Sequence, residues 1–131
     1  MVERAPSIML DRSALQGASE LQQEFPFLPL RYFIVHGVPG DASRGEHAHK
    51  QCHQFLICVS GSCRATIDDG NARTEVLLDR PHLGLHLPPL TWGTQFQYSA
   101  DAALLVLASH PYDADDYIGD YDAFLKVKRE A

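Results

Sequence analysis

Two histidines, His47 and His49, are the residues of this sequence best suited to chemistry. They lie in the charged segment RGEHAHK, residues 44–50, and one residue separates them. Side chains two positions apart on a β-strand point to the same face of the sheet. An imidazole can take up or release a proton near neutral pH, and it can also bind a metal through a ring nitrogen. The pair therefore predicts either an acid–base site or a metal site.

Short strands separated by turn residues must position this pair. Runs rich in aromatic and β-branched residues alternate with clusters of Gly, Pro, Asn, Asp and Ser, and an Asp-Gly pair at 69–70 marks a hairpin. The expected strands are 30–35, 44–50, 54–59, 63–67, 74–78, 83–87, 91–98 and 103–108. About eight short strands at this spacing predict an all-β antiparallel sandwich or barrel. The tail, 114–126, predicts one short helical segment on the outside, with its aspartates facing solvent.

The whole chain limits the classes of function. Its 131 residues predict one domain, 1–131, and its 45% hydrophobic and 21% charged residues are those of an ordinary globular protein. A net charge of −6 argues against nucleic acid as a partner, although a few arginines could still bind a small anion. No apolar run is long enough to span a bilayer, and the N-terminus lacks a signal-peptide pattern. We therefore expect a cytoplasmic protein that does not bind a membrane.

The cysteines support the same location. Cys52, Cys58 and Cys63 are odd in number and fit no zinc or disulfide spacing. Cys58 and Cys63 are expected to be buried thiols, and Cys52, beside the histidine segment, is a weak ligand candidate.

The order of residues around the histidines resembles the first motif of the cupins, which are double-stranded β-helix (jelly-roll) proteins. That motif has two histidines one residue apart, then a glutamate, then a glycine, and this chain has His47, His49, Gln54 and Gly61. The amide of Gln54 binds a divalent cation more weakly than a carboxylate would. The second cupin motif should supply another histidine, but the segment PPLTWGTQF, 88–96, contains none. A metal site would then need His53 or His86 as a substitute.

Because the glutamate and the further histidine of a metal cupin are missing, the acid–base interpretation of the histidine pair is favoured. Two imidazoles inside a barrel suit removal of a proton next to a carbonyl and its return to the neighbouring carbon. A positioned general base contributes on the order of 10² to 10⁴ in rate. Hydrogen bonds from Arg, Gln or Tyr would stabilise the enolate oxygen.

Longer segments carry a more specific resemblance. RYFIV, RGEHAHK, ICVSGSCRATIDDG, VLLDRPHLGLHLPPLTW and LLVLASHPYDADDYIGDYDAFL are similar to the dTDP-sugar 3,4-ketoisomerases, over roughly residues 30–125. The resemblance implies a metal-free cupin without a cofactor that converts dTDP-4-keto-6-deoxyglucose to a 3-keto-6-deoxy-hexose in amino-sugar biosynthesis. It also implies a homodimer, with N-terminal strands from the segment 1–25 exchanged between subunits.

The resemblance assigns the acid–base roles. It makes His47 the base that takes the proton from carbon 3, and His49 the group that delivers a proton to carbon 4 or orients the keto oxygen. Arg44 would stabilise the ene-diolate or the diphosphate, and Arg31 is a second diphosphate candidate.

The remaining candidates would bind substrate. Gln54 would form hydrogen bonds within the pocket, and Trp92 with Tyr32 or Phe33 would line the sugar or thymine pocket. Lys50 is a further contact, or it extends into solvent. The sequence departs from the family at Phe33, where relatives often carry a tyrosine, and at Gly119, where they often carry a basic residue.

Two other functions stay open. One is a metal-dependent cupin enzyme, such as a dioxygenase, that uses His47, His49 and either His53 or His86. The other is a cupin that binds a sugar without catalysis.

Overall fold

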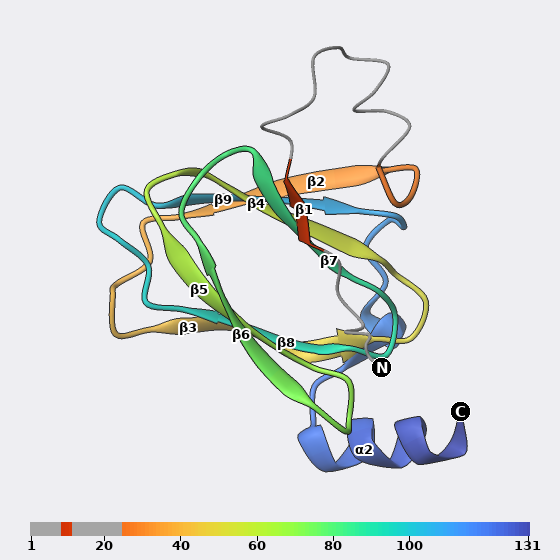
Figure 1. Cartoon of the computed structure of the whole chain (residues 1–131). Coiled ribbons are helices and arrows are strands. Elements are labelled where there is room, and N and C mark those ends of the chain that lie inside the picture. Colours follow the sequence, from red (N-terminus) through yellow and green to blue (C-terminus); the bar gives the residue numbers. More distant parts are fainter. Residues whose placement is uncertain (1–8, 12–24) are drawn as a thin grey trace.

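The computed structural model describes residues 9–11 and 25–131, and within these residues the chain forms two facing antiparallel sheets (Figure 1). One sheet has the order β1-β7-β4-β9-β2 and the other β10-β3-β8-β5-β6. The strands are β1 Met9–Asp11, β2 Arg31–His36, β3 Ser43–His49, β4 Gln54–Ser60, β5 Cys63–Asp68, β6 Arg73–Leu78, β7 Leu83–Leu87, β8 Trp92–Phe96, β9 Ala103–Ala108 and β10 Tyr117–Ile118. The predicted all-β jelly roll is therefore confirmed.

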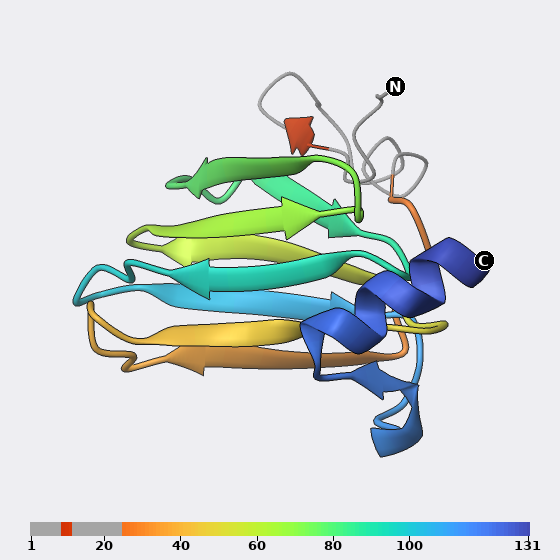
Figure 2. The same ribbon diagram turned by 90° about the horizontal axis from the view of Figure 1, so that it is seen from below.

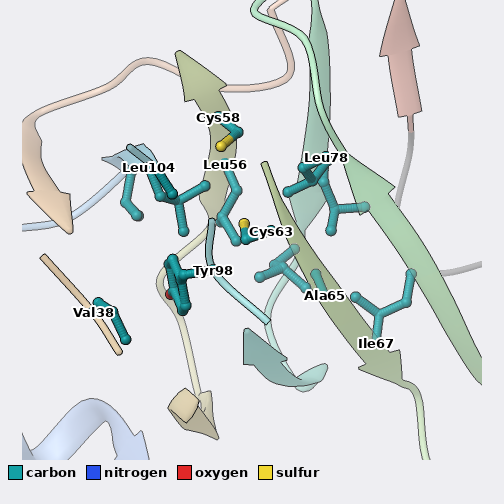
Figure 3. Close-up of a cluster of buried hydrophobic side chains, with 13 residues drawn as sticks. Val38, Leu56, Cys58, Cys63, Ala65, Ile67, Leu78, Tyr98 and Leu104 are labelled. Atoms are coloured by element: carbon teal, nitrogen blue, oxygen red, sulfur yellow. The ribbon is translucent and has the colours of Figure 1, made fainter. Parts of the chain in front are cut away.

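The core fills the space between the sheets. It gathers small and medium apolar side chains from both sheets, with the ring of Tyr98 beside them (Figure 3). Its members include Leu56, Cys58, Cys63, Ala65, Ile67, Leu78, Leu85, Leu104 and Val106. Cys58 and Cys63 are buried free thiols, as expected, and Cys52 is a buried free thiol as well.

The C-terminal tail differs from the prediction. It begins with a 3-10 turn, η1 (Ala114–Asp116), continues as β10, and only then forms the helix α2 (Tyr121–Glu130). The helix starts at Asp120 because that side chain accepts a hydrogen bond from the Ala123 amide, which satisfies one of the free N–H groups of the first turn. Figure 2 shows α2 lying across the outside of the sheet that contains β3.

Trp92 lies beneath this helix. Its indole packs edge-on against Tyr121 and contacts Phe124, in a second apolar cluster with Ala48 and Ile118. The neighbouring Gly93 faces the space between the sheets, opposite His47. Because faces alternate along a strand, Trp92 must face outward. The prediction that it lines the sugar pocket is therefore wrong.

Tyr32 also lies on an outer face. Residues 31, 33 and 35 of β2 are half-buried and the residues between them are exposed, so Phe33 and Val35 pack on the core while Tyr32 is 68% exposed. The prediction of Tyr32 in the pocket is wrong for the same reason of alternation, and Phe33 is the aromatic residue of this strand that faces inward.

A β-bulge interrupts β3 just before the histidines. Arg44 pairs with Gln95 and His47 pairs with Gly93, so Glu46 is an extra residue on the β3 side. Gly45 and Glu46 both have positive φ, at 86° and 58°. Gln95 and Gly93 are two apart and share one face, so Arg44 and His47 also share it, although they are three apart. The bulge thus puts Arg44 on the histidine face.

Candidate active site

The two predicted histidines lie together on the inner face of β3. Their rings are nearly perpendicular, with centroids 4.9 Å apart, and the two Nε2 atoms are 3.2 Å apart. They border a cavity of about 20 Å³, whose other lining residues are Gln54, Leu87, Pro88, Thr91, Gly93 and Gln95. Such a volume holds about one water-sized group, which is the size of a hydroxyl or keto oxygen on a sugar carbon.

The outer nitrogen of each ring has its own hydrogen-bond partner. Nδ1 of His47 is 2.9 Å from the carbonyl oxygen of Gly45, inside the bulge. Nδ1 of His49 is 2.9 Å from Oδ2 of Asp116, at the end of η1. The four groups therefore form one continuous chain, from the Asp116 carboxylate through both imidazoles to the Gly45 carbonyl.

Asp116 is held by the backbone that follows β3. The amide of Gln51 donates to its Oδ1 at 2.7 Å, and the amide of Cys52 donates to its Oδ2 at 3.3 Å. Burial raises the pKa of the Asp116 carboxyl, but the bonds from His49 and from these two amides outweigh it and bring the pKa below its usual value. The carboxylate is thus ionised at neutral pH.

Burial is the largest effect on the pKa of each imidazole. It lowers the pKa of His47, against a smaller opposing effect of the bond to Gly45. It also lowers the pKa of His49, where the hydrogen bond to Asp116 opposes it and the charges of His47 and Arg31 reinforce it. Tyr117 packs against both rings, with centroids 4.9 Å from His47 and 4.4 Å from His49. This ring holds the pair in place.

Asp116 and Tyr117 were not predicted as site residues. The tail aspartates were expected to face solvent, whereas the Asp116 side chain is only 12% exposed. Its partner His49 is 67 residues away in the chain, and the pairing of β10 with β3 brings them together. No local spacing signals that pairing, so the sequence alone held no pointer to either residue.

Of the other predicted candidates, Gln54 borders the same cavity, and Arg31 and Phe33 lie on the half-buried side of β2. Gln54 is buried and lines the cavity. The Arg31 guanidinium lies over the rings of Phe33 and Tyr112, at 5.3 Å and 5.9 Å, and its Nε donates to the carbonyl of His110. The charge of Arg31 contributes to the lowering of the pKa of His49.

Arg44 and Lys50 flank β3 at its two ends and are both exposed. Arg44 donates to the carbonyl of Ser43 at 2.8 Å, and its charge opposes the burial that raises the pKa of Tyr98. The backbone amide of Lys50 donates to the carbonyl of Asp116, which fastens η1 to the end of β3.

His53 and His86 do not reach this cavity. Nδ1 of His53 is 3.0 Å from Nε2 of His86, and both rings lie near Phe27. His86 pairs with Phe55, whereas the adjacent residues Leu87 and Gln54 pair with each other and line the cavity. The His53–His86 pair is therefore on the outer face of β4 and β7, and the suggestion that either histidine completes a metal site with His47 and His49 is wrong.

One group within the described ranges has metal-ligand atom types close together, namely His49, Cys52 and Asp116, within 4.8 Å. Its atoms are already engaged with protein groups. Both Asp116 oxygens accept backbone hydrogen bonds, and the Cys52 thiol donates to the carbonyl of His53. These three residues therefore fit a hydrogen-bonded cluster that orients His49 better than they fit a metal site.

Comparison with known proteins gives the family. A family model named FdtA, described as WxcM-like, C-terminal, matches residues 4–129. The chain belongs to this family. A curated relative, the TDP-4-oxo-6-deoxy-alpha-D-glucose-3,4-oxoisomerase of Aneurinibacillus thermoaerophilus, is 42% identical over 109 residues, which are 83% of this chain and 78% of the relative.

Solved structures of sugar 3,4-ketoisomerases are similar to this chain over most of its length. The sugar 3,4-ketoisomerase QdtA of Thermoanaerobacterium thermosaccharolyticum, solved with TDP, has a TM-score of 0.87 at 28% identity and covers 99% of this chain and 98% of its own. The TDP-quinovose 3,4-ketoisomerase WlaRB of Campylobacter jejuni is 40% identical, with a TM-score of 0.76 over 80% of this chain and 81% of its own. In the part of the chain that the structure describes, no helix has the length and apolarity needed to cross a membrane.

Proposed function

We propose that this chain is a dTDP-sugar 3,4-ketoisomerase that acts on dTDP-4-keto-6-deoxyglucose without a metal or another cofactor. The observation that carries the proposal is the inward-facing pair His47 and His49, whose Nε2 atoms are 3.2 Å apart beside the cavity. The Aneurinibacillus relative bears the name of this activity, and a histidine-to-asparagine variant of QdtA was crystallised with TDP-4-keto-6-deoxyglucose.

The reaction moves protons and needs no oxidant. His47 removes the proton from carbon 3, the electron pair forms a double bond to carbon 4, and the keto oxygen receives a proton, which gives an ene-diol. The hydroxyl on carbon 3 then loses its proton, and carbon 4 receives one, with His49 as donor. Carbon 3 is left as the ketone. Each half needs one base and one acid, and the two adjacent imidazoles supply both.

The surrounding residues would bind the charged and polar parts of the substrate. Arg31 is on the half-buried side of β2, and Arg44 is on the same side of β3 as His47; as cations they suit the diphosphate or the ene-diolate oxygen. Gln54 offers an amide to the sugar hydroxyls, and Phe33 offers an apolar surface. Lys50 is a further candidate contact at the end of β3.

One experiment separates this proposal from its rivals. The purified protein is incubated with dTDP-4-keto-6-deoxyglucose in heavy water, and the sugar is followed by nuclear magnetic resonance. We expect a 3-keto product with deuterium in the sugar, and the configuration of carbon 4 shows which face was protonated. Binding of the nucleotide sugar without product or deuterium would indicate a non-catalytic cupin. Activity that a chelator abolishes and a stoichiometric transition metal restores would indicate a metal-dependent enzyme.

The homodimer is part of the proposal. On the outer face of β2 and the residues before it, Leu28, Leu30, Tyr32 and Ile34 are between 51% and 75% exposed and form a continuous apolar stripe on an edge strand. A second copy of the chain is the occupant that the family implies. Exchange of N-terminal strands falls mostly on residues outside the described ranges; β1 itself pairs with β7 of its own chain.

A charged substitution within the stripe tests whether it forms the dimer interface. Tyr32→Glu is expected to shift the protein from dimer to monomer in analytical ultracentrifugation, because a buried unpaired carboxylate is costly at an interface. Leu77→Glu, at an exposed apolar residue of β6, serves as the control and should leave the dimer intact. A Tyr32→Glu protein that sediments as the parent dimer does would exclude the stripe as the interface.

The cytoplasmic location is also part of the proposal, and the three free thiols support it.

A further inference from the structure

We propose that His47 and His49 hold a single proton between their Nε2 atoms, and that Asp116 is the positioning residue that maintains this state. The catalytic consequence rests on the proposed function, whereas the protonation state itself does not. The proposal follows from the chain of hydrogen bonds that runs from Asp116 to Gly45.

The groups at the two ends of this hydrogen-bond chain, Gly45 and Asp116, determine which ring nitrogens carry protons. The carbonyl of Gly45 can only accept a hydrogen bond, so Nδ1 of His47 must carry a hydrogen. The Asp116 carboxylate also only accepts, so Nδ1 of His49 must carry one too. A neutral imidazole has a single N–H group, and both Nε2 atoms would therefore be bare lone pairs.

Two bare lone pairs repel each other at 3.2 Å, the distance between the Nε2 atoms. One additional proton turns this repulsion into an N–H···N hydrogen bond of ordinary length. A second additional proton would place two positive rings in contact, which their mutual repulsion opposes. Burial lowers the pKa of both rings and acts against either proton, so the contact between the Nε2 atoms and the Asp116 carboxylate are what favour the first. The geometry therefore fits one proton for the pair.

The surrounding charges also favour one proton. Asp116 is ionised and fixed by the Gln51 and Cys52 amides, so it balances one positive charge on the pair. The charge of Arg31 lowers the pKa of His49, so it opposes protonation of the pair and disfavours a second proton further. The ring of Tyr117 packs against both imidazoles at a tilt, and Gln54 and Thr91 beside the cavity are neutral.

This state makes the pair a base and an acid at once. The bare Nε2 of His47 accepts the proton of carbon 3 while His49 donates to the keto oxygen, and the pair again holds one proton. This proton then crosses the 3.2 Å between the Nε2 atoms to His49, which donates it to carbon 4 while His47 accepts the proton of the carbon 3 hydroxyl. The second half of the reaction therefore starts from the same charge as the first. Without Asp116, His49 is free to turn or to change tautomer, and the pair releases its proton at lower pH.

Nitrogen resonances test the protonation state in the unliganded protein. In protein labelled with ¹⁵N-histidine, we expect both Nδ1 atoms to show the shift of a protonated nitrogen, and both Nε2 atoms to show shifts between those of protonated and bare nitrogens at pH 7. Two Nε2 atoms with the shift of a bare lone pair would overturn the proposal. The spectra need neither substrate nor a variant, so an inactive protein with a shared proton would refute the proposed function alone.

Asp116→Asn tests the positioning role. We expect the alkaline limb of the kcat/KM profile and the loss of the shared proton to move about one pH unit lower, and kcat to fall about 10- to 100-fold with KM nearly unchanged. Asp115→Asn removes the same charge from the preceding residue of η1, which is exposed, and should behave as the parent protein does. An Asp116→Asn protein whose alkaline limb and Nε2 shifts stay in place would show that Asp116 has only a structural role.

Discussion

Replacement of His47 with asparagine is expected to lower kcat by about 10² to 10⁴ and to abolish deuterium exchange at carbon 3 of the sugar. Asparagine retains an N–H group that can donate to the Gly45 carbonyl, as Nδ1 of His47 does, but it has no basic nitrogen. The loss should appear in kcat with little change in KM, because proton removal stabilises the transition state and not the bound substrate.

The control for this variant is another histidine of the chain. His36→Asn changes an exposed residue at the end of β2, so its kinetics should equal those of the parent. Circular dichroism and thermal unfolding of both variants show whether the fold is retained. A folded His47→Asn protein with full activity would eliminate His47 as the base at carbon 3.

The second large effect is expected at Gly45. A Cβ atom at this position would lie 2.9 Å from Oε1 of Gln95 and 3.0 Å from the carbonyl oxygen of Gly93, and φ is +86°. Gly45→Ala therefore strains the bulge that places Arg44 on the face of the histidines. The carbonyl that accepts the hydrogen bond from His47 also belongs to Gly45. We expect kcat to fall on the order of 10²-fold, as a displacement of about 1 Å in a catalytic group can cause.

Gly37→Ala is a control that separates the effect of a positive φ from the effect of the close contacts at Gly45. Gly37 has a similar φ of +67°, but a Cβ there meets nothing within 4 Å. Both variants should lose about 1–2 kcal/mol of unfolding free energy from the left-handed conformation, measured by denaturant titration, and only Gly45→Ala should lose more than that and lose activity. Equal losses of stability, with activity retained in both, would contradict a role for the bulge.

The local patterns of the sequence predicted the strands and the histidine pair well. Each predicted strand exists, because alternation and turn residues are local signals, and the spacing of His47 and His49 places both rings on one face. Trp92 was misplaced because the sequence of β8 does not reveal which set of alternating residues faces inward. Gly93, which has no side chain, occupies the inner face opposite His47, and the larger ring packs outside.

The features that the sequence did not predict depend on pairing between strands that are far apart in the chain. Asp116 contacts His49 only because β10 adds to the edge of β3, and a two-residue strand has too few residues for a recognisable pattern. The bulge at Gly45 and Glu46 was equally hidden, since it depends on the register between β3 and β8.

The alternation of β3 also joins the proposed catalytic pair to the C-terminal helix. Ala48, between the two histidines, is fully buried on the opposite face against Ile118 and Phe124. A change in the size of residue 48 or 124 therefore moves the strand that carries both imidazoles without placing any atom in the pocket. For directed evolution, this buried contact on the outer face of the sheet offers a way to adjust the alignment of the acid and the base while every substrate contact keeps its chemical identity.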